Sequence, residues 1–182
     1  MHYNLEWVKT QFEADERLKF LFFWGHHPNR NGQIGKSCFS QWWESDFQVD
    51  GIIYKTAEHW MMAEKARLFE DETTLSKILK SKSAAEAKKL GRRVRNFDEE
   101  TWKTHRYDIV KRGNRHKFNQ NKTLKDFLIL TSNRILVEAS PYDKIWGIGM
   151  KAGYEGIDNP YNWKGLNLLG FAIMEIRDEI LD

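Results

Sequence analysis

Two charged residues stand among apolar ones where the apolar spacing predicts a helix over about residues 56–69. Glu58 and Lys65 are seven positions apart, so at about 100° per residue they share one face with two methionines and a phenylalanine. A rise of about 1.5 Å per residue separates the two charges by about 10 Å along the axis. That separation is too long for a salt bridge and suits two groups that flank one small ligand.

Two interpretations of this helix face remain open. If both side chains line a pocket, burial and neighbouring charges would tune their pKa values for acid–base or nucleophilic work. A lysine with a lowered pKa can attack an aldehyde as a free amine, which gives Lys65 a candidate role. In the alternative, Glu58 and Lys65 reach solvent at the edge of the apolar stripe or pair with other helices.

A second group of candidate residues lies in the segment YDKIWGIG, residues 142–149, after a predicted strand. Gly147 and Gly149 would let the backbone approach a ligand closely or adopt positive φ. Trp146 would stack on a base while Asp143 accepts a hydrogen bond or a proton. The alternative is a structural turn in which Trp146 fills the core. A lone G-x-G without a following helix does not indicate a dinucleotide site.

Tryptophan is abundant, with eight in the chain, and this favours an aromatic ligand. Trp102 and Arg106 are i, i+4 neighbours on a predicted helix. Either Arg106 lies over the indole, or Trp102 forms a second aromatic wall of a binding pocket.

Several classes of site and location are disfavoured by the sequence. The histidines have no Cys or His partner at zinc spacing, and no motif for a cofactor is present, so we expect neither a metal nor a cofactor. The single cysteine, Cys38, excludes an intrachain disulfide. No apolar run approaches the roughly 20 residues of a membrane span, and the N-terminus is charged. We therefore expect a cytoplasmic protein with no membrane partner.

The chain is predicted to form one α+β domain, residues 1–182, mostly helical with a small antiparallel sheet. Residues 19–24 and 134–140 are typical of buried strands, and 46–56 of a hairpin with a type I′ turn at Asp50–Gly51. Besides the helix at 56–69, capping residues and periodicity predict helices that begin after Asp71, Ser83 and Asp98, one at 122–131, and a last one at 166–181.

Seven segments together resemble the NADAR family, also called YbiA-like, and they span nearly the whole chain. They are CFSQWWESDF, VDGIIYKTAEHWMMAEKARLF, AKKLGRRVR, ETWKTHRYDIV, KFNQNKTLKDFLILT, ILVEASPYDKIWGIG and WKGLNLLGFAIMEIRD. The resemblance implies an N-glycosidase that acts on ribose attached to an amine or base. It places the family's acid at Glu58, its lysine at Lys65, its loop aspartate at Asp143 and its two aromatic positions at Trp102 and Trp146.

Two substrate classes are associated with that family: ADP-ribose attached to guanine in nucleic acid, and phosphoribosylamino-pyrimidine intermediates of riboflavin synthesis. We favour the first, because the long loops 25–37 and 150–165 and the basic segments 77–95 and 111–122 suit a large anionic substrate. A toxin with ADP-ribosyltransferase activity would then be a candidate partner.

The remaining expectations concern phosphate contacts and functions other than catalysis. Substrate binding is expected to involve Gly147, Gly149, Arg92, Arg93 and Lys151, the last three through phosphate groups. Two alternatives to an enzyme stay open. One is a module that binds ADP-ribose or NAD without cleaving it, and the other is a protein that binds unmodified nucleic acid through the two basic segments.

Overall fold

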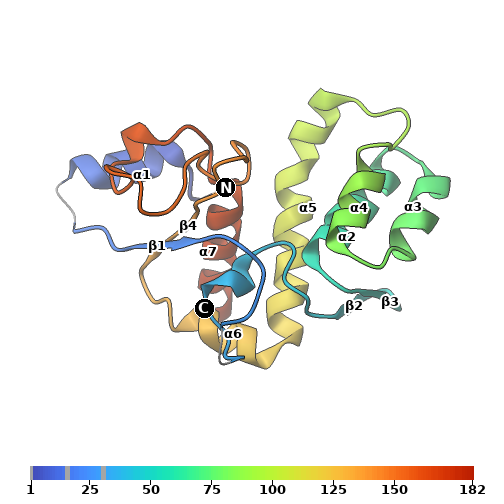
Figure 1. Cartoon of the computed structure of the whole chain (residues 1–182), viewed down its shortest axis with the longest axis horizontal. Helices are drawn as coiled ribbons and strands as arrows, with labels where there is room; N and C mark the ends of the chain where they lie inside the picture. Colours follow the sequence, from blue (N-terminus) through green and yellow to red (C-terminus); the bar gives the residue numbers. More distant parts are fainter. Residues whose placement is uncertain (1, 15–16, 30–31) are drawn as a thin grey trace. The chain divides into compact units, whose positions relative to one another are not determined.

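The computed structural model describes residues 2–14, 17–29 and 32–182, and the chain folds into two compact units (Figure 1). Unit 1 comprises Met1–Ser40 and Thr123–Asp182, and unit 2 comprises Gln41–Lys122. No helix within the described ranges combines the length and apolar character that a membrane crossing needs.

Unit 1 is built around two parallel strands, β1 (Phe20–Phe23) and β4 (Ile135–Glu138), with Phe23 opposite Glu138. Parallel strands need a long crossover, and here residues 24–134 supply it. Helix α7 (Leu168–Leu181) packs on β4, and six of its apolar residues are buried in the core of the unit. The other elements are α1 (Leu5–Glu13), η1 (Lys36–Phe39), α6 (Lys122–Ile129) and η2 (Pro160–Asn162).

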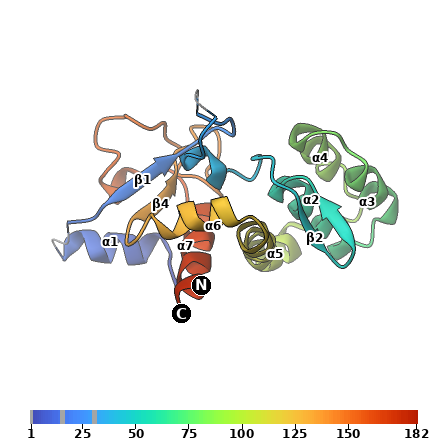
Figure 2. The ribbon, with the colours of Figure 1, turned by 90° about the horizontal axis from the view of Figure 1, so that it is seen from below.

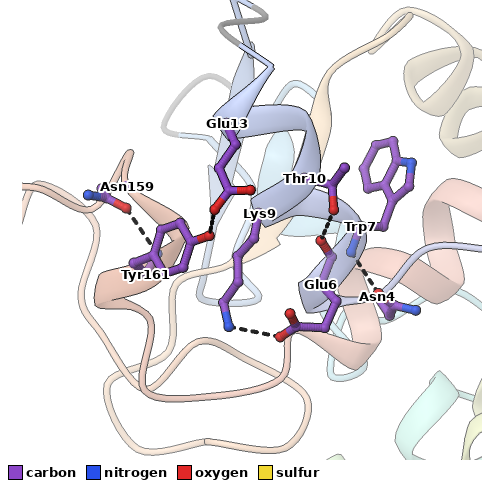
Figure 3. A network of polar contacts seen from close by, with 8 residues as sticks. All are labelled: Asn4, Glu6, Trp7, Lys9, Thr10, Glu13, Asn159 and Tyr161. Atoms are coloured by element: carbon purple, nitrogen blue, oxygen red, sulfur yellow. Dashed lines mark hydrogen bonds and ion pairs between the residues drawn. The ribbon is translucent and has the colours of Figure 1, made fainter.

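Helix α1 is joined to η2 by side-chain contacts at the surface of unit 1 (Figure 3). Tyr161 donates a hydrogen bond to Glu13, and the Lys9 ammonium lies 5.3 Å from the Tyr161 ring centroid. Asn4 caps α1 by accepting a hydrogen bond from the backbone N–H of Trp7 at 2.8 Å. These contacts hold an N-terminal helix that the sequence pattern did not predict.

Unit 2 contains the hairpin β2 (Phe47–Val49) and β3 (Ile52–Tyr54) and four helices. Asp50 and Gly51 both have positive φ, 49° and 79°, as a type I′ turn requires. Helix α2 (Ala57–Leu68) contacts each of the other three helices, as Figures 1 and 2 show. These are α3 (Glu72–Leu79), α4 (Ala84–Gly91) and α5 (Glu99–Gln120).

Two glycines let the neighbouring helices approach α2 closely. A Cβ at Gly91 of α4 would lie 2.0 Å from the sulfur of Met62, and a Cβ at Gly113 of α5 would lie 2.2 Å from Cδ1 of Trp60. The Trp60 indole N–H also donates to the backbone oxygen of Ile109 at 2.8 Å. These contacts bury residues on all sides of α2, including polar ones.

The predicted α+β class is confirmed, and so are the antiparallel hairpin and the caps at Asp71, Ser83 and Asp98. The observed helices agree with the predicted ones to within a few residues, apart from α1. Strands β1 and β4 also form where expected, but their parallel pairing was not foreseen. The assignment of residues 1–182 to a single domain stays a prediction.

The contact between Gly113 and Trp60 can be tested by substitution. Alanine in a helix interior is favoured over glycine by about 1 kcal/mol, so Gly113→Ala would stabilise an uncrowded helix. Here the added methyl would overlap the indole, and we expect a net loss of about 1–3 kcal/mol in the free energy of unfolding. Urea denaturation measures the change, with the exposed Asn119→Ala in the same helix as control. A more stable Gly113→Ala protein would contradict the proposed close packing.

Candidate functional site

Glu58 lies in the first turn of α2, and only 2% of its surface is exposed. Thr56 caps the helix: its hydroxyl oxygen accepts from the backbone N–H of His59 at 3.3 Å and lies 2.8 Å from Nδ1 of the same histidine. The backbone N–H of Glu58 donates to the backbone oxygen of Gln41 at 2.9 Å. The first turn carries the positive end of the helix dipole, which stabilises a carboxylate there.

Lys65 lies on the same face of α2, seven residues after Glu58, and its ammonium packs against aromatic rings. It is 4.0 Å from the Phe97 ring centroid and 5.5 Å from that of Trp102. Burial lowers the pKa of Lys65, and the charge of Glu99 partly opposes this shift. Phe69 packs edge-on against Phe97 at 5.3 Å and extends this aromatic cluster.

The surroundings of Lys65 bear on the alternatives that the sequence left open. Its charged head lies over aromatic faces in a half-buried position, a setting that stabilises a cation while removing water. The cation that the structure places over the Trp102 ring is Lys65, whereas the sequence also suggested Arg106. Sequence reasoning missed Phe97, which lies between α4 and α5 outside any periodic pattern.

Asp143 forms the turn that shapes the second group of candidate residues. One of its carboxylate oxygens accepts from the backbone N–H groups of Ile145 and Trp146, each at 2.8 Å. Its backbone oxygen accepts from Gly149 at 3.0 Å. This arrangement is an Asx turn, so Asp143 has a structural role whatever else it does.

The glycines of this segment are needed by the loop itself. A Cβ at Gly147 would lie 2.7 Å from the backbone oxygen of Glu138, and Gly149 has a φ of +66°. The loop also binds the start of α7, because Leu168 donates to the Ile145 oxygen at 3.2 Å and Leu169 to the Trp146 oxygen at 3.1 Å. Asp143 and Trp146 are therefore held on a firmly supported backbone.

The three residues expected at phosphates are all exposed. Arg92 and Arg93 follow the C-terminal end of α4, and Lys151 follows the Asp143 loop. Their exposure leaves the guanidinium and ammonium groups accessible to an anion, and the phosphate contacts stay a prediction.

The predicted site residues fall into two groups by unit. Unit 2 holds Glu58, Lys65, Trp102, Arg92 and Arg93, and within it the structure brings Lys65 and Trp102 together. Unit 1 holds Asp143, Trp146, Gly147, Gly149 and Lys151, and the first four share one hydrogen-bonded loop.

Chemically, unit 2 offers a buried carboxylate and a partly desolvated amine on one helix face, beside aromatic rings. Such groups are suited to stabilising positive charge and to nucleophilic attack on a carbonyl. Within the described ranges, no cluster of three or more His, Cys, Asp or Glu is placed to hold a metal ion.

Comparisons with known proteins agree on one family. The model of the NADAR domain matches residues 22–181. The chain is 46% identical to N-glycosidase R617 of Acanthamoeba polyphaga mimivirus over 170 residues, which are 90% of this chain and 98% of that protein. It is 33% identical to the chloroplastic riboflavin biosynthesis protein PYRR of Zea mays over 143 residues, 75% of this chain and 21% of that protein. The NMR structure of Escherichia coli YbiA has a TM-score of 0.70 at 26% identity, covering 90% of this chain and 85% of that one.

The environment of Lys65 makes a prediction about its titration. Because burial favours the neutral amine, Lys65 should titrate below the ordinary lysine pKa of about 10.4. The Glu99 carboxylate raises the pKa of Lys65, so Glu99→Gln should lower it further. NMR of lysine labelled with ¹³C at Cε measures both midpoints, with Lys65→Arg to assign the signal.

Glu100→Gln is the matched control for that titration, because Glu100 pairs with Lys103 at 2.7 Å on the same helix turn. It should leave the Lys65 midpoint in place. A midpoint for Lys65 at or above the ordinary value would contradict the desolvated position of its ammonium.

Proposed function

The chain belongs to the NADAR family and is an N-glycosidase, and from this premise we propose that its substrate is ADP-ribose attached to guanine in nucleic acid. The enzyme breaks the bond between C1′ of the ribose and a guanine nitrogen and releases ADP-ribose. The observation that carries the proposed chemistry is the buried Glu58 on the same helix face as the partly desolvated Lys65. A module that only binds its ligand has no need of such a pair.

Glu58 is proposed to stabilise the positive charge that builds on the ribose as the C1′–N bond breaks. Its low exposure strengthens this effect, because charges interact more strongly where water is excluded. In a direct hydrolysis, Glu58 activates the water that adds to C1′, and the departing guanine nitrogen takes up a proton. Asp143 is proposed as a further acid of the reaction; one of its carboxylate oxygens accepts the two backbone bonds of its own turn.

Lys65 supports a second, covalent route. If the ribose ring opens while guanine is still attached, C1′ becomes an iminium carbon, and the neutral amine of Lys65 adds to it. The guanine nitrogen then departs with a proton and leaves an imine between C1′ and Lys65, which water later hydrolyses to release ADP-ribose. The lowered pKa raises the fraction of neutral amine near pH 7. Trp102 and Trp146 are proposed to hold a base or the sugar by stacking.

A nucleic-acid substrate is supported by the basic segments 77–95 and 111–122 and by the exposed Arg92, Arg93 and Lys151, which suit several phosphates. An ADP-ribosyltransferase toxin acting on guanine would produce this substrate. The similarity to the maize riboflavin biosynthesis protein favours a second candidate, a phosphoribosylamino-pyrimidine. Incubating the protein with each substrate in turn and measuring consumption separates the two.

The role of Glu58 is tested by Glu58→Gln, which keeps the shape and removes the charge. We expect release of ADP-ribose from ADP-ribosylated guanosine in DNA to slow by about 10²–10⁴-fold, because the charge on the ribose loses its counter-ion. Glu175→Gln removes a comparably buried acid from α7 and should keep activity. Unchanged turnover in Glu58→Gln would remove this residue from the mechanism.

The covalent route is tested by trapping. Borohydride added during turnover should reduce an imine at Lys65 to a stable secondary amine, detected by intact mass and peptide mapping. Lys65→Ala should abolish this adduct, while Lys82→Ala, at an exposed position before α4, should retain it. If the wild-type protein turns over substrate but yields no adduct, the direct attack of water is the route instead.

A further inference from the structure

Two large aromatic rings are exposed side by side in unit 1. Trp24 is 48% exposed and Tyr142 is 86% exposed, and their ring centroids lie 6.3 Å apart with planes tilted by 52°. At this tilt the two rings do not cover each other, so each offers a face to a ligand. Neither ring has been assigned a role in the reaction described above.

The parallel pairing of β1 and β4 explains why residues so distant in sequence meet. Phe23 is opposite Glu138 at the ends of the two strands, and Ala139 donates to the Phe23 oxygen at 2.9 Å. Because the two strands are parallel, the segments that follow them leave the sheet at the same end. Trp24 is the first residue after β1, and Tyr142 immediately precedes Asp143, so the aromatic pair is continuous with the Asp143 loop.

Three exposed lysines lie on the segment that contains the Asp143 loop, residues 141–165, which also carries Asp143, Glu155 and Asp158. Lys144 and Lys164 both flank Gly149, where a Cβ would lie 3.1 Å from Cγ of Lys144 and 3.2 Å from Cβ of Lys164. Both lysines are exposed, as is Lys151. The neighbouring carboxylate, Asp143, is engaged in its own turn. Cations beside exposed aromatic faces are the combination with which proteins bind single-stranded nucleic acid, through phosphates and base stacking.

We propose that Trp24 and Tyr142 form a stacking platform for the bases that neighbour the modified guanine in a single strand. The three lysines contact the phosphates of those neighbouring nucleotides. The platform rests on the proposed function in that it assumes a modified base within a polymer. It adds a specificity determinant to that function, because a single modified nucleotide has no neighbouring bases to stack.

The test compares two substrates that carry the same ADP-ribosyl guanine. One is a single-stranded oligodeoxynucleotide, and the other is the modified mononucleotide. In the double variant Trp24→Ala/Tyr142→Ala, the ratio of kcat/KM for the oligonucleotide to kcat/KM for the mononucleotide should fall about 10-fold or more. A ratio equal to that of the wild-type protein would overturn the proposal.

Tyr161→Ala is the matched control, because it removes a ring of similar exposure, 51%, from the same unit. That ring contacts Lys9 and Glu13 of α1 (Figure 3). It is not part of the Trp24–Tyr142 pair. The substrate ratio should stay within about twofold of wild type. Thermal melting of all variants identifies any loss of folding.

Binding of an unmodified strand tests the platform independently of catalysis. A fluorescent oligothymidine of about 12 nucleotides should bind the wild-type protein more weakly as salt rises, and the double variant should lose at least about 10-fold in affinity. Lys144→Gln/Lys164→Gln should flatten the salt dependence. Equal affinity of wild type and double variant would overturn the platform.

The two proposals fail in different ways. If the wild-type protein cleaves neither ADP-ribosylated substrate, the proposed function fails, and oligothymidine binding still decides whether the platform exists. If it cleaves both and the double variant keeps the wild-type substrate ratio, the platform fails and the proposed function stands.

Discussion

The close packing of α5 against Trp60 fixes the rotation of α2, and the positions of the candidate catalytic residues of unit 2 follow from that rotation. The indole sits against Gly113 and donates to the Ile109 oxygen, so the Trp60 face of α2 must point toward α5. At about 100° per residue, Glu64 and Arg67 lie near this face, whereas Glu58 and Lys65 lie on the opposite one. Two acids and two bases on one helix are thereby sorted into separate environments.

The two environments treat charge differently. On the Trp60 face, Glu64 accepts hydrogen bonds from both Arg67 and Arg112, so its charge is met by two guanidinium groups. On the other face, Lys65 is stabilised by the quadrupoles of two aromatic rings, and Glu58 by the first turn of its helix. For Lys65 the rings offset only part of the cost of burial, and the remaining cost lowers its pKa, as is common at functional sites.

Much of the fold could be predicted because its signals are local. Asp71, Ser83 and Asp98 are residue types that cap helices, so each predicts the start of a helix from its own side chain. Asp50–Gly51 predicts the hairpin because these two residue types are preferred in a type I′ turn. The pairing of β1 with β4 has no local signal, because residues 24–134 separate two short apolar runs. For the same reason, the large sequence separation, the contact between Trp24 and Tyr142 could not be predicted.

The candidate site shows the same division between local and distant signals. The shared face of Glu58 and Lys65 follows from helical spacing, and the Asx turn at Asp143 follows a known local preference. Phe97 was missed because it lies in the irregular segment before α5, and only the packing of helices brings it to the Lys65 ammonium.

The start of α7 limits how unit 1 can meet an anionic substrate. A helix N-terminus is a common phosphate site because its first backbone N–H groups lack partners. In α7 the first two of these groups are taken, since Leu168 and Leu169 donate to the oxygens of Ile145 and Trp146. The Asp143 loop therefore caps the N-terminal end of α7, and the same hydrogen bonds stabilise the loop. Negative charge on a ligand of this unit must then be met by side chains such as Lys144, Lys151 and Lys164. Because these exposed ammonium groups are strongly hydrated, their attraction for phosphates is sensitive to salt and independent of base sequence.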